Sequence, residues 1–286
     1  MPEFDLFIGV DWSGAKGLSH RGIAVSEAKK GSDRPIIVSP TNGAKYWSRK
    51  EVVSYLLDRS KQQKVLAGID FAFCYPYLDK NSYFPDAKYA PKTAIQLWSL
   101  IEQINQNAPD YYGGIIWQHP IFSAYYNSPG NKGSLFSSRR RVTELVARQI
   151  KSPSPTFNCV GPAGVGTGSL AGMRMLHDLK GHACRWPIET NFEVALTVCE
   201  IFPTYYFALA GIRAIKGVQA QLEILNQALA FFGSEPMTDD FIAKGPDFDE
   251  ADALISAAAL RNLADKRHLW QVPESAMYEG WIFGVE

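Results

Sequence analysis

Phe4-Asp5-Leu6-Phe7-Ile8-Gly9-Val10-Asp11 is an apolar run that ends in a carboxylate, and Val65-Leu66-Ala67-Gly68-Ile69-Asp70 repeats that form. Short apolar runs of this kind predict buried strands. A charge at the end of a buried strand is costly unless it is paired or bound to a metal ion. We therefore interpret Asp11 and Asp70 as functional carboxylates, with an aspartate that merely forms a turn as the alternative for each.

The chain around these two runs predicts a mixed α/β sheet. Residues 21–28 and 35–39 are typical of strands, and Ser48 precedes a helical stretch with Glu51 three residues later, the pattern of a capping box. A later strand is predicted at 194–202. We expect residues 1–286 to form a single domain, in which the segment of approximately 72–160, rich in Tyr, Pro, Asn and Ser, is an insertion or lid.

Two further acids open a strongly helical stretch near the end of the sequence. Asp249 and Asp252 are three residues apart, so on a helix they share one face and can reach a common ligand. The alternative is that a helix N-terminus simply favours acids through its dipole. Glu200 lies inside the apolar run 196–202, where we expect it either to bind metal or to pair with a buried cation such as Arg174.

Charge is balanced over the whole chain, with 29 basic and 29 acidic residues, so the net charge indicates no polyanionic partner. Locally it is uneven. Segment 132–151 carries six basic residues against Glu144, whereas segment 235–252 carries seven acids against Lys244. An acidic pocket beside a basic flank would suit metal ions and a phosphodiester, and two ordinary solvated faces are the alternative.

The N-terminal residues lack the basic start of a signal peptide, and no uninterrupted apolar stretch of about 18 residues follows. Four cysteines show no metal-binding spacing, and reduced thiols are the default interpretation. We therefore expect a cytoplasmic protein with no membrane partner.

Phosphate contacts are predicted at two glycine-containing turns. Ser13 and Lys16 follow Asp11 closely, and Gly166 and Gly168 belong to a glycine-rich stretch that precedes a helix from about residue 170. A glycine-rich turn into a helix N-terminus can hold an anion. An exposed turn lysine and a flexible loop with a helix cap are the respective alternatives.

Five short motifs follow one another along the chain: Gly9-Val10-Asp11-Trp12-Ser13-Gly14, Gly68-Ile69-Asp70-Phe71-Ala72, Glu200-Ile201-Phe202-Pro203-Thr204, Asp249-Glu250-Ala251-Asp252-Ala253 and Glu279-Gly280-Trp281-Ile282. Their identity and order resemble the domain-of-unknown-function 429 family, which is described as predicted nucleases with a ribonuclease H-like fold. The resemblance implies a mixed five-stranded sheet flanked by helices, with carboxylates on strand one, on strand four and on a late helix. The long aromatic-rich insertion would then follow strand four.

The chemistry that suits these acids is phosphodiester hydrolysis of nucleic acid with Mg²⁺ or Mn²⁺, because such ions favour carboxylate oxygens and can activate water. We expect Asp11, Asp70 and Asp252 to be catalytic, with Asp11 bridging two ions and Asp249 and Glu200 as further ligands. One alternative is an ATP-dependent phosphotransferase of the actin-like class, in which the turn after Asp11 holds phosphate. The other is a non-catalytic binding protein, in which the acids are structural.

Overall fold

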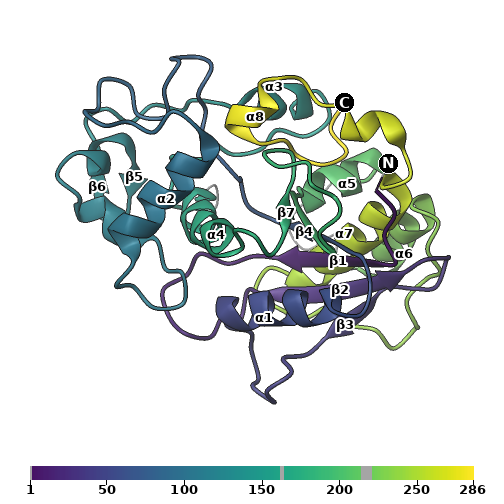
Figure 1. Cartoon of the computed structure of the whole chain (residues 1–286). Coiled ribbons are helices and arrows are strands. Elements are labelled where there is room, and N and C mark those ends of the chain that lie inside the picture. The colour runs from purple at the N-terminus through teal and green to yellow at the C-terminus, as the bar shows by residue number, and fades with distance from the viewer. Residues whose placement is uncertain (1, 162–163, 214–220) are drawn as a thin grey trace.

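A mixed six-stranded sheet forms the centre of the computed structural model, which describes residues 2–161, 164–213 and 221–286 (Figure 1). The first three strands along the chain pair antiparallel, and the other three run parallel to the first. The α/β class and the mixed sheet are therefore confirmed. In order across the sheet the strands are β3 (Ile36–Val38), β2 (Ala24–Lys29), β1 (Leu6–Asp11), β4 (Val65–Ile69), β8 (Leu196–Glu200) and β7 (Cys184–Arg185).

The sixth strand departs from the expected count of five. β7 is only two residues long and pairs with β8 at the sheet edge, where Arg185 lies beside Val198. The described residues also form eight α-helices, which are α1 (Arg49–Ser60), α2 (Ala94–Asn105), α3 (Val142–Ala147), α4 (Gly166–Asp178), α5 (Pro203–Leu209), α6 (Leu222–Phe231), α7 (Asp249–Leu263) and α8 (Ala276–Glu279). Of these, α1 and α7 pack against strands of the sheet.

The parallel pairing of β1, β4 and β8 brings their carboxyl ends to one edge of the sheet. Val10 lies beside Ile69, and Ile69 lies beside Glu200. Asp11 ends β1 and Asp70 directly follows β4. Three of the acids singled out in the sequence are therefore neighbours across the strands, as the topology of parallel strands requires.

Helix α7 packs directly against β1 because Gly9 has no side chain. A Cβ atom at Gly9 would lie 2.3 Å from the carbonyl oxygen of Ala253 and 2.7 Å from the amide nitrogen of Ala257. Alanines fill the buried side of the helix, so the two backbones approach closely. The start of α7 is thereby held beside the end of β1.

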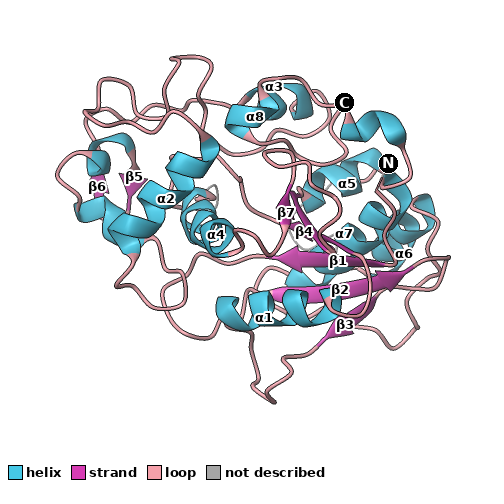
Figure 2. Ribbon diagram, in the orientation of Figure 1, coloured by secondary structure: helices cyan, strands magenta, loops and turns pink. Residues whose placement is uncertain are grey.

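The segment 72–160 lies between β4 and α4, and Figure 2 shows that much of it is loop. Its aromatic side chains, among them Tyr75 and Phe157, belong to the same apolar cluster as Val10 and Ile69 of the sheet. The segment therefore shares the core of the sheet. Besides α2 and α3 it contains the 3-10 helices η1 (Gly114–Gln118) and η2 (Phe122–Tyr125), and the two-stranded pair β5 (Asn127–Ser128) and β6 (Asn131–Lys132).

Ser48 caps helix α1 as predicted, because its hydroxyl accepts a hydrogen bond from the Glu51 amide at 3.1 Å. The capping box is not completed, since the Glu51 carboxylate accepts a hydrogen bond from the Asn42 amide. Helix α4 begins at Gly166, earlier than the predicted residue 170.

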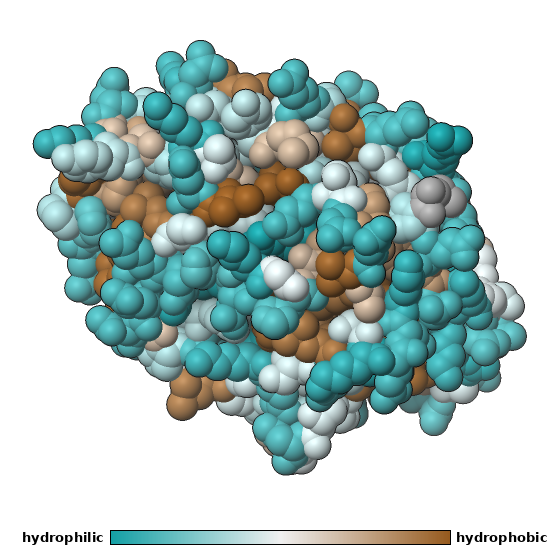
Figure 3. Space-filling model, viewed as in Figure 1, coloured by the Kyte–Doolittle hydropathy of each residue, from teal (hydrophilic) through white to brown (hydrophobic). Residues whose placement is uncertain are grey.

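None of the helices in the described residues is long and apolar enough to cross a bilayer. On the face shown in Figure 3, apolar residues form separate patches among hydrophilic ones.

Candidate functional site

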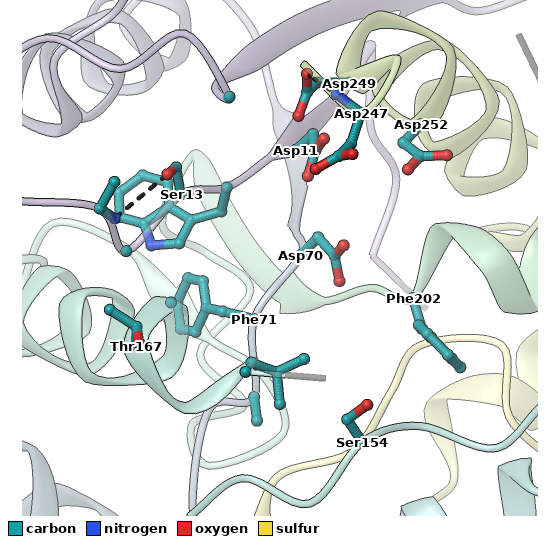
Figure 4. Close-up of a pocket in the computed structure, with 18 of the residues that line it drawn as sticks. Asp11, Ser13, Asp70, Phe71, Ser154, Thr167, Phe202, Asp247, Asp249 and Asp252 are labelled. Atoms are coloured by element: carbon teal, nitrogen blue, oxygen red, sulfur yellow. Dashed lines mark hydrogen bonds between the residues drawn. The ribbon is translucent and has the colours of Figure 1, made fainter. Parts of the chain in front are cut away.

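All five predicted acids line one cavity of about 790 Å³ at the carboxyl edge of the sheet, namely Asp11, Asp70, Glu200, Asp249 and Asp252. Figure 4 shows Asp11, Asp249 and Asp252 gathered on one wall of this cavity, with Asp70 beside Asp11. They come from the end of β1, the residue after β4 and the first turn of α7. The structure therefore brings together residues separated by up to about 240 positions in the chain.

The electrostatics of this cluster centre on Asp11. Burial of most of its surface raises the pKa of the Asp11 carboxyl well above its usual range. The carboxylates of Asp252, Asp70 and Asp249 raise that pKa further, in this order of effect. A hydrogen bond between the Asp11 and Asp249 side chains raises the pKa of Asp11 and lowers that of Asp249. Burial is the largest influence on Asp249 and leaves its pKa raised overall.

Asp70 is perturbed in the same direction. Burial raises the pKa of its carboxyl to about 7, and the charge of Glu200 contributes to that rise. Without a bound cation, Asp70 is therefore partly protonated at neutral pH. Like-charged groups in a desolvated cavity attract either protons or cations, and both relieve the repulsion.

Glu200 is paired with a buried cation, which was one of its two predicted roles, but that cation is Arg141 and not Arg174. The two guanidinium nitrogens of Arg141 donate to the two oxygens of Glu200 at 2.7 and 2.5 Å. The Phe73 amide donates to the same carboxylate at 3.0 Å. Arg174 lies elsewhere and pairs with Glu102 at 2.7 Å. The reason is topological, since the chain returns at Arg141 to the end of β8.

The basic flank predicted at 132–151 is in part an internal structure. Arg141 also contacts Glu144 at 2.7 Å and is almost fully buried. Arg139 forms an ion pair with Asp79 at 2.6 Å and donates to backbone carbonyls nearby. These arginines neutralise acids and satisfy carbonyl groups of their own chain, so local charge counting overstated the positive surface of this segment.

The loop after β1 packs against the beginning of α4. A Cβ atom at Gly14 would lie 2.3 Å from the Gly168 amide nitrogen, so only glycine allows this contact. Ser13, Lys16 and Gly168 all line the cavity, beside the first turn of a helix whose amides have no partner within the helix. Gly166 lies differently, because it is buried and its amide donates to the Asn158 carbonyl at 2.9 Å. Residues 162 and 163 of the glycine-rich stretch lie outside the described residues.

Buried Arg49 fixes this loop and was not identified from the sequence. Its guanidinium donates to the carbonyl oxygens of Ser13, at 2.6 Å, and of Ala15. It also contacts Asp110, whose carboxylate accepts hydrogen bonds from the Arg49 amide at 3.1 Å and meets His20 Nε2 at 2.8 Å. The segment 72–160 therefore holds the cavity loop in place through Asp110.

Asp247 is a further acid on the cavity wall, beyond the five predicted ones, and it is labelled in Figure 4. Its amide donates to the Asp249 carboxylate at 3.3 Å, and its charge raises the pKa of Asp249. Gly245, with a φ of 104°, allows the chain to fold closely around Asp249. The acidic stretch 235–252 signalled this residue, but its loop position gave no periodicity from which to place it.

The carboxylates line one cavity without forming a finished metal site. Across residues 2–161, 164–213 and 221–286, no group of three or more His, Cys, Asp or Glu side chains is arranged to hold a metal ion. The donor type does suit a hard divalent cation, because all five predicted ligands in the cavity carry carboxylate oxygens.

Comparisons with known proteins found no relative of this chain. No protein-family model, no curated protein and no solved structure matches this chain. The site is therefore interpreted from its own residues.

Proposed function

We propose that this protein is a metal-dependent phosphodiesterase that hydrolyses nucleic acid, with Mg²⁺ or Mn²⁺ as its cofactor. One observation carries the proposal. Carboxylates from β1, from the end of β4 and from the start of α7 line a single cavity, where they raise the pKa of Asp11 together. A divalent cation would relieve the repulsion between carboxylates in a desolvated cavity, and such cations take carboxylate oxygens as ligands.

The proposed ligands are Asp11, Asp70, Asp249 and Asp252. When bound, the ions would lower the pKa of a water molecule and stabilise the leaving oxygen. Because no group of three acids in the described residues is already arranged around one point, we expect metal binding to draw these side chains together. We leave Glu200 out of the set, since Arg141 engages both of its oxygens.

Residues on the cavity wall would bind and orient the phosphate of the substrate. Ser13, Lys16 and the first turn of α4 at Gly168 lie on the cavity wall, where a helix N-terminus and a lysine favour a phosphate. Arg49 holds the loop through the Ser13 carbonyl and therefore acts as a positioning residue. Gly166 is excluded from phosphate contact, because its amide already has a partner.

The resemblance to the domain-of-unknown-function 429 family supports the same reading. A ribonuclease H-like sheet would comprise β1, β2, β3, β4 and β8, with β7 as an added edge strand and 72–160 as the insertion after strand four. Asp11 lies on strand one, Asp70 follows strand four, and Asp249 and Asp252 lie on a late helix. These are the positions that the resemblance implies for the carboxylates.

Cleavage assays with purified protein test the proposal. Single-stranded DNA, duplex DNA, RNA and an RNA–DNA hybrid are incubated with Mn²⁺, with Mg²⁺ or with a chelator. We expect metal-dependent cleavage of at least one substrate, and a loss of at least 100-fold in Asp11→Asn. Asp239→Asn serves as the matched control, because it removes an exposed carboxylate that does not line the cavity.

Two results would count against the proposal. Cleavage that survives unchanged in Asp11→Asn would place the activity elsewhere. Binding of ATP with transfer of its phosphate, and no nuclease activity, would favour the phosphotransferase alternative.

A further inference from the structure

A second hollow adjoins the acidic cavity and shares two of its residues, Arg21 and Asp249. Its volume is about 400 Å³, and it lies over the neighbouring strands β2 and β3. Its wall on the sheet side is apolar, and the loop residues Tyr46 and Trp47 complete it. The two hollows therefore adjoin at Arg21, three residues before the start of β2, and at Asp249.

The sign of the charge changes from one hollow to the other. The acidic cavity has carboxylates at its centre, whereas three exposed cations surround the second hollow, namely Arg21, Lys45 and Lys244. Two acids, the shared Asp249 and Glu250, also line this hollow, so the cations exceed the acids by one. The Glu250 carboxylate accepts a hydrogen bond from the Lys244 amide at 2.8 Å. The Lys45 ammonium lies 5.3 Å from the centre of the Tyr46 ring, so a cation and an aromatic face stand together.

We propose that the second hollow holds nucleotides next to the scissile phosphate, so that the substrate is a single-stranded polynucleotide segment and not a mononucleotide. This inference rests on the proposed function and deepens it. Backbone phosphates contact Arg21, Lys45 and Lys244, while half-buried Tyr46 offers a ring on which a base stacks. Cations with an aromatic side chain are the combination that binds single strands without reading sequence.

The expected loss of affinity for single strands can be calculated from counterion release. On single strands each phosphate contact contributes about 0.7 to the slope of log K against log salt, which corresponds to about 5-fold in affinity at 0.1 M salt. Loss of the two lysines should therefore weaken binding by about 25-fold and reduce the slope by about 1.4.

The test is fluorescence anisotropy of labelled 15-mers of thymidylate and of uridylate, at several salt concentrations and in a chelator, so that no cleavage occurs. Wild type is compared with Lys45→Ala/Lys244→Ala. The control is Lys88→Ala/Lys92→Ala, since both of these lysines are exposed, neither lines either hollow, and Lys88 lies 5.0 Å from the ring of Tyr89. We expect the control to bind as wild type does.

Equal binding by wild type and Lys45→Ala/Lys244→Ala, or an equal loss in the control, would overturn the inference. Loss confined to the uridylate or the thymidylate 15-mer would support it and assign the polymer. Failure of the proposed function is distinguishable, because it would appear as absent metal-dependent cleavage while lysine-dependent binding persists in the chelator.

Discussion

Removing the charge of Asp70 should make the metal-free protein more stable at neutral and alkaline pH. The pKa of Asp70 is raised from 3.8 to about 7, first by burial and then by Glu200. Its carboxyl therefore binds a proton more tightly in the folded than in the unfolded protein. Stability is lost as the pH rises from about 4 to about 7, and it stays low above that range.

The size of the effect follows from the same shift. A rise of about 3 pKa units corresponds to about 4 kcal/mol, of which about 2.5 kcal/mol falls between pH 5 and pH 8. Asp70→Asn keeps the shape of the side chain and removes this penalty. Between pH 5 and pH 8, the free energy of unfolding of the variant should therefore fall by about 2.5 kcal/mol less than that of wild type. At pH 8, Mn²⁺ should restore the stability of wild type but stabilise the variant much less.

Urea unfolding in a chelator at pH 5, 6, 7 and 8 measures these free energies. Asp239→Asn, at an exposed carboxylate, controls for the general effect of one charge less. An identical pH dependence in wild type and Asp70→Asn would refute the reasoning, because it would mean that Asp70 ionises in the folded protein as freely as in the unfolded chain.

Three further changes test the packing and the internal ion pairs. Gly9→Ala should destabilise by at least about 2 kcal/mol in urea unfolding, since its Cβ would meet the Ala253 carbonyl at 2.3 Å, and unchanged stability would deny this close packing. Arg141→Met should cost about 3 to 5 kcal/mol in thermal and urea unfolding, and adding Glu200→Leu should recover part of it; no recovery would contradict the pairing. Asp110→Asn should cost about 3 kcal/mol and reduce cleavage through the loosened cavity loop, whereas normal stability would remove its anchoring role.

The sequence predicted the features that depend on local pattern. The strands ending at Asp11 and near Asp70 and Glu200 are entirely or almost entirely buried, so their apolar runs carried a clear signal. The helix that begins at Asp249 was equally readable from its alanines and acids. Because parallel strands align their ends, placing these elements in a mixed sheet was enough to bring the acids to one edge.

The contacts that shape the site were not readable in this way. Arg141 meets Glu200 across 59 positions, and Arg49 meets Asp110 across 61. No local pattern distinguishes such arginines from solvated ones, so segment charge suggested a basic surface where the structure forms internal ion pairs.

The start of α4 shows how tertiary packing overrides helix propensity. Glycine disfavours helix, so the sequence placed the first turn after the glycine-rich stretch. In the structure that turn packs against Gly14, and a Cβ at Gly172 would lie 2.2 Å from the ring of Phe71. These close approaches require glycine at positions 14 and 172, and the helix begins at Gly166 in spite of its glycines.

Titration calorimetry with Mn²⁺ tests the central claim most directly, because it asks whether the clustered carboxylates bind a cation. Burial and the neighbouring carboxylates raise the pKa of Asp11, and a metal ion binds the ionised form, so metal binding should release protons. Titrations in two buffers of different ionisation enthalpy measure the number of protons released. Wild type should bind Mn²⁺ with net proton release, and Asp11→Asn should lose most of the Mn²⁺ binding and most of the proton release. The account would be contradicted if wild type bound no Mn²⁺, or if Asp11→Asn bound Mn²⁺ as tightly as wild type does.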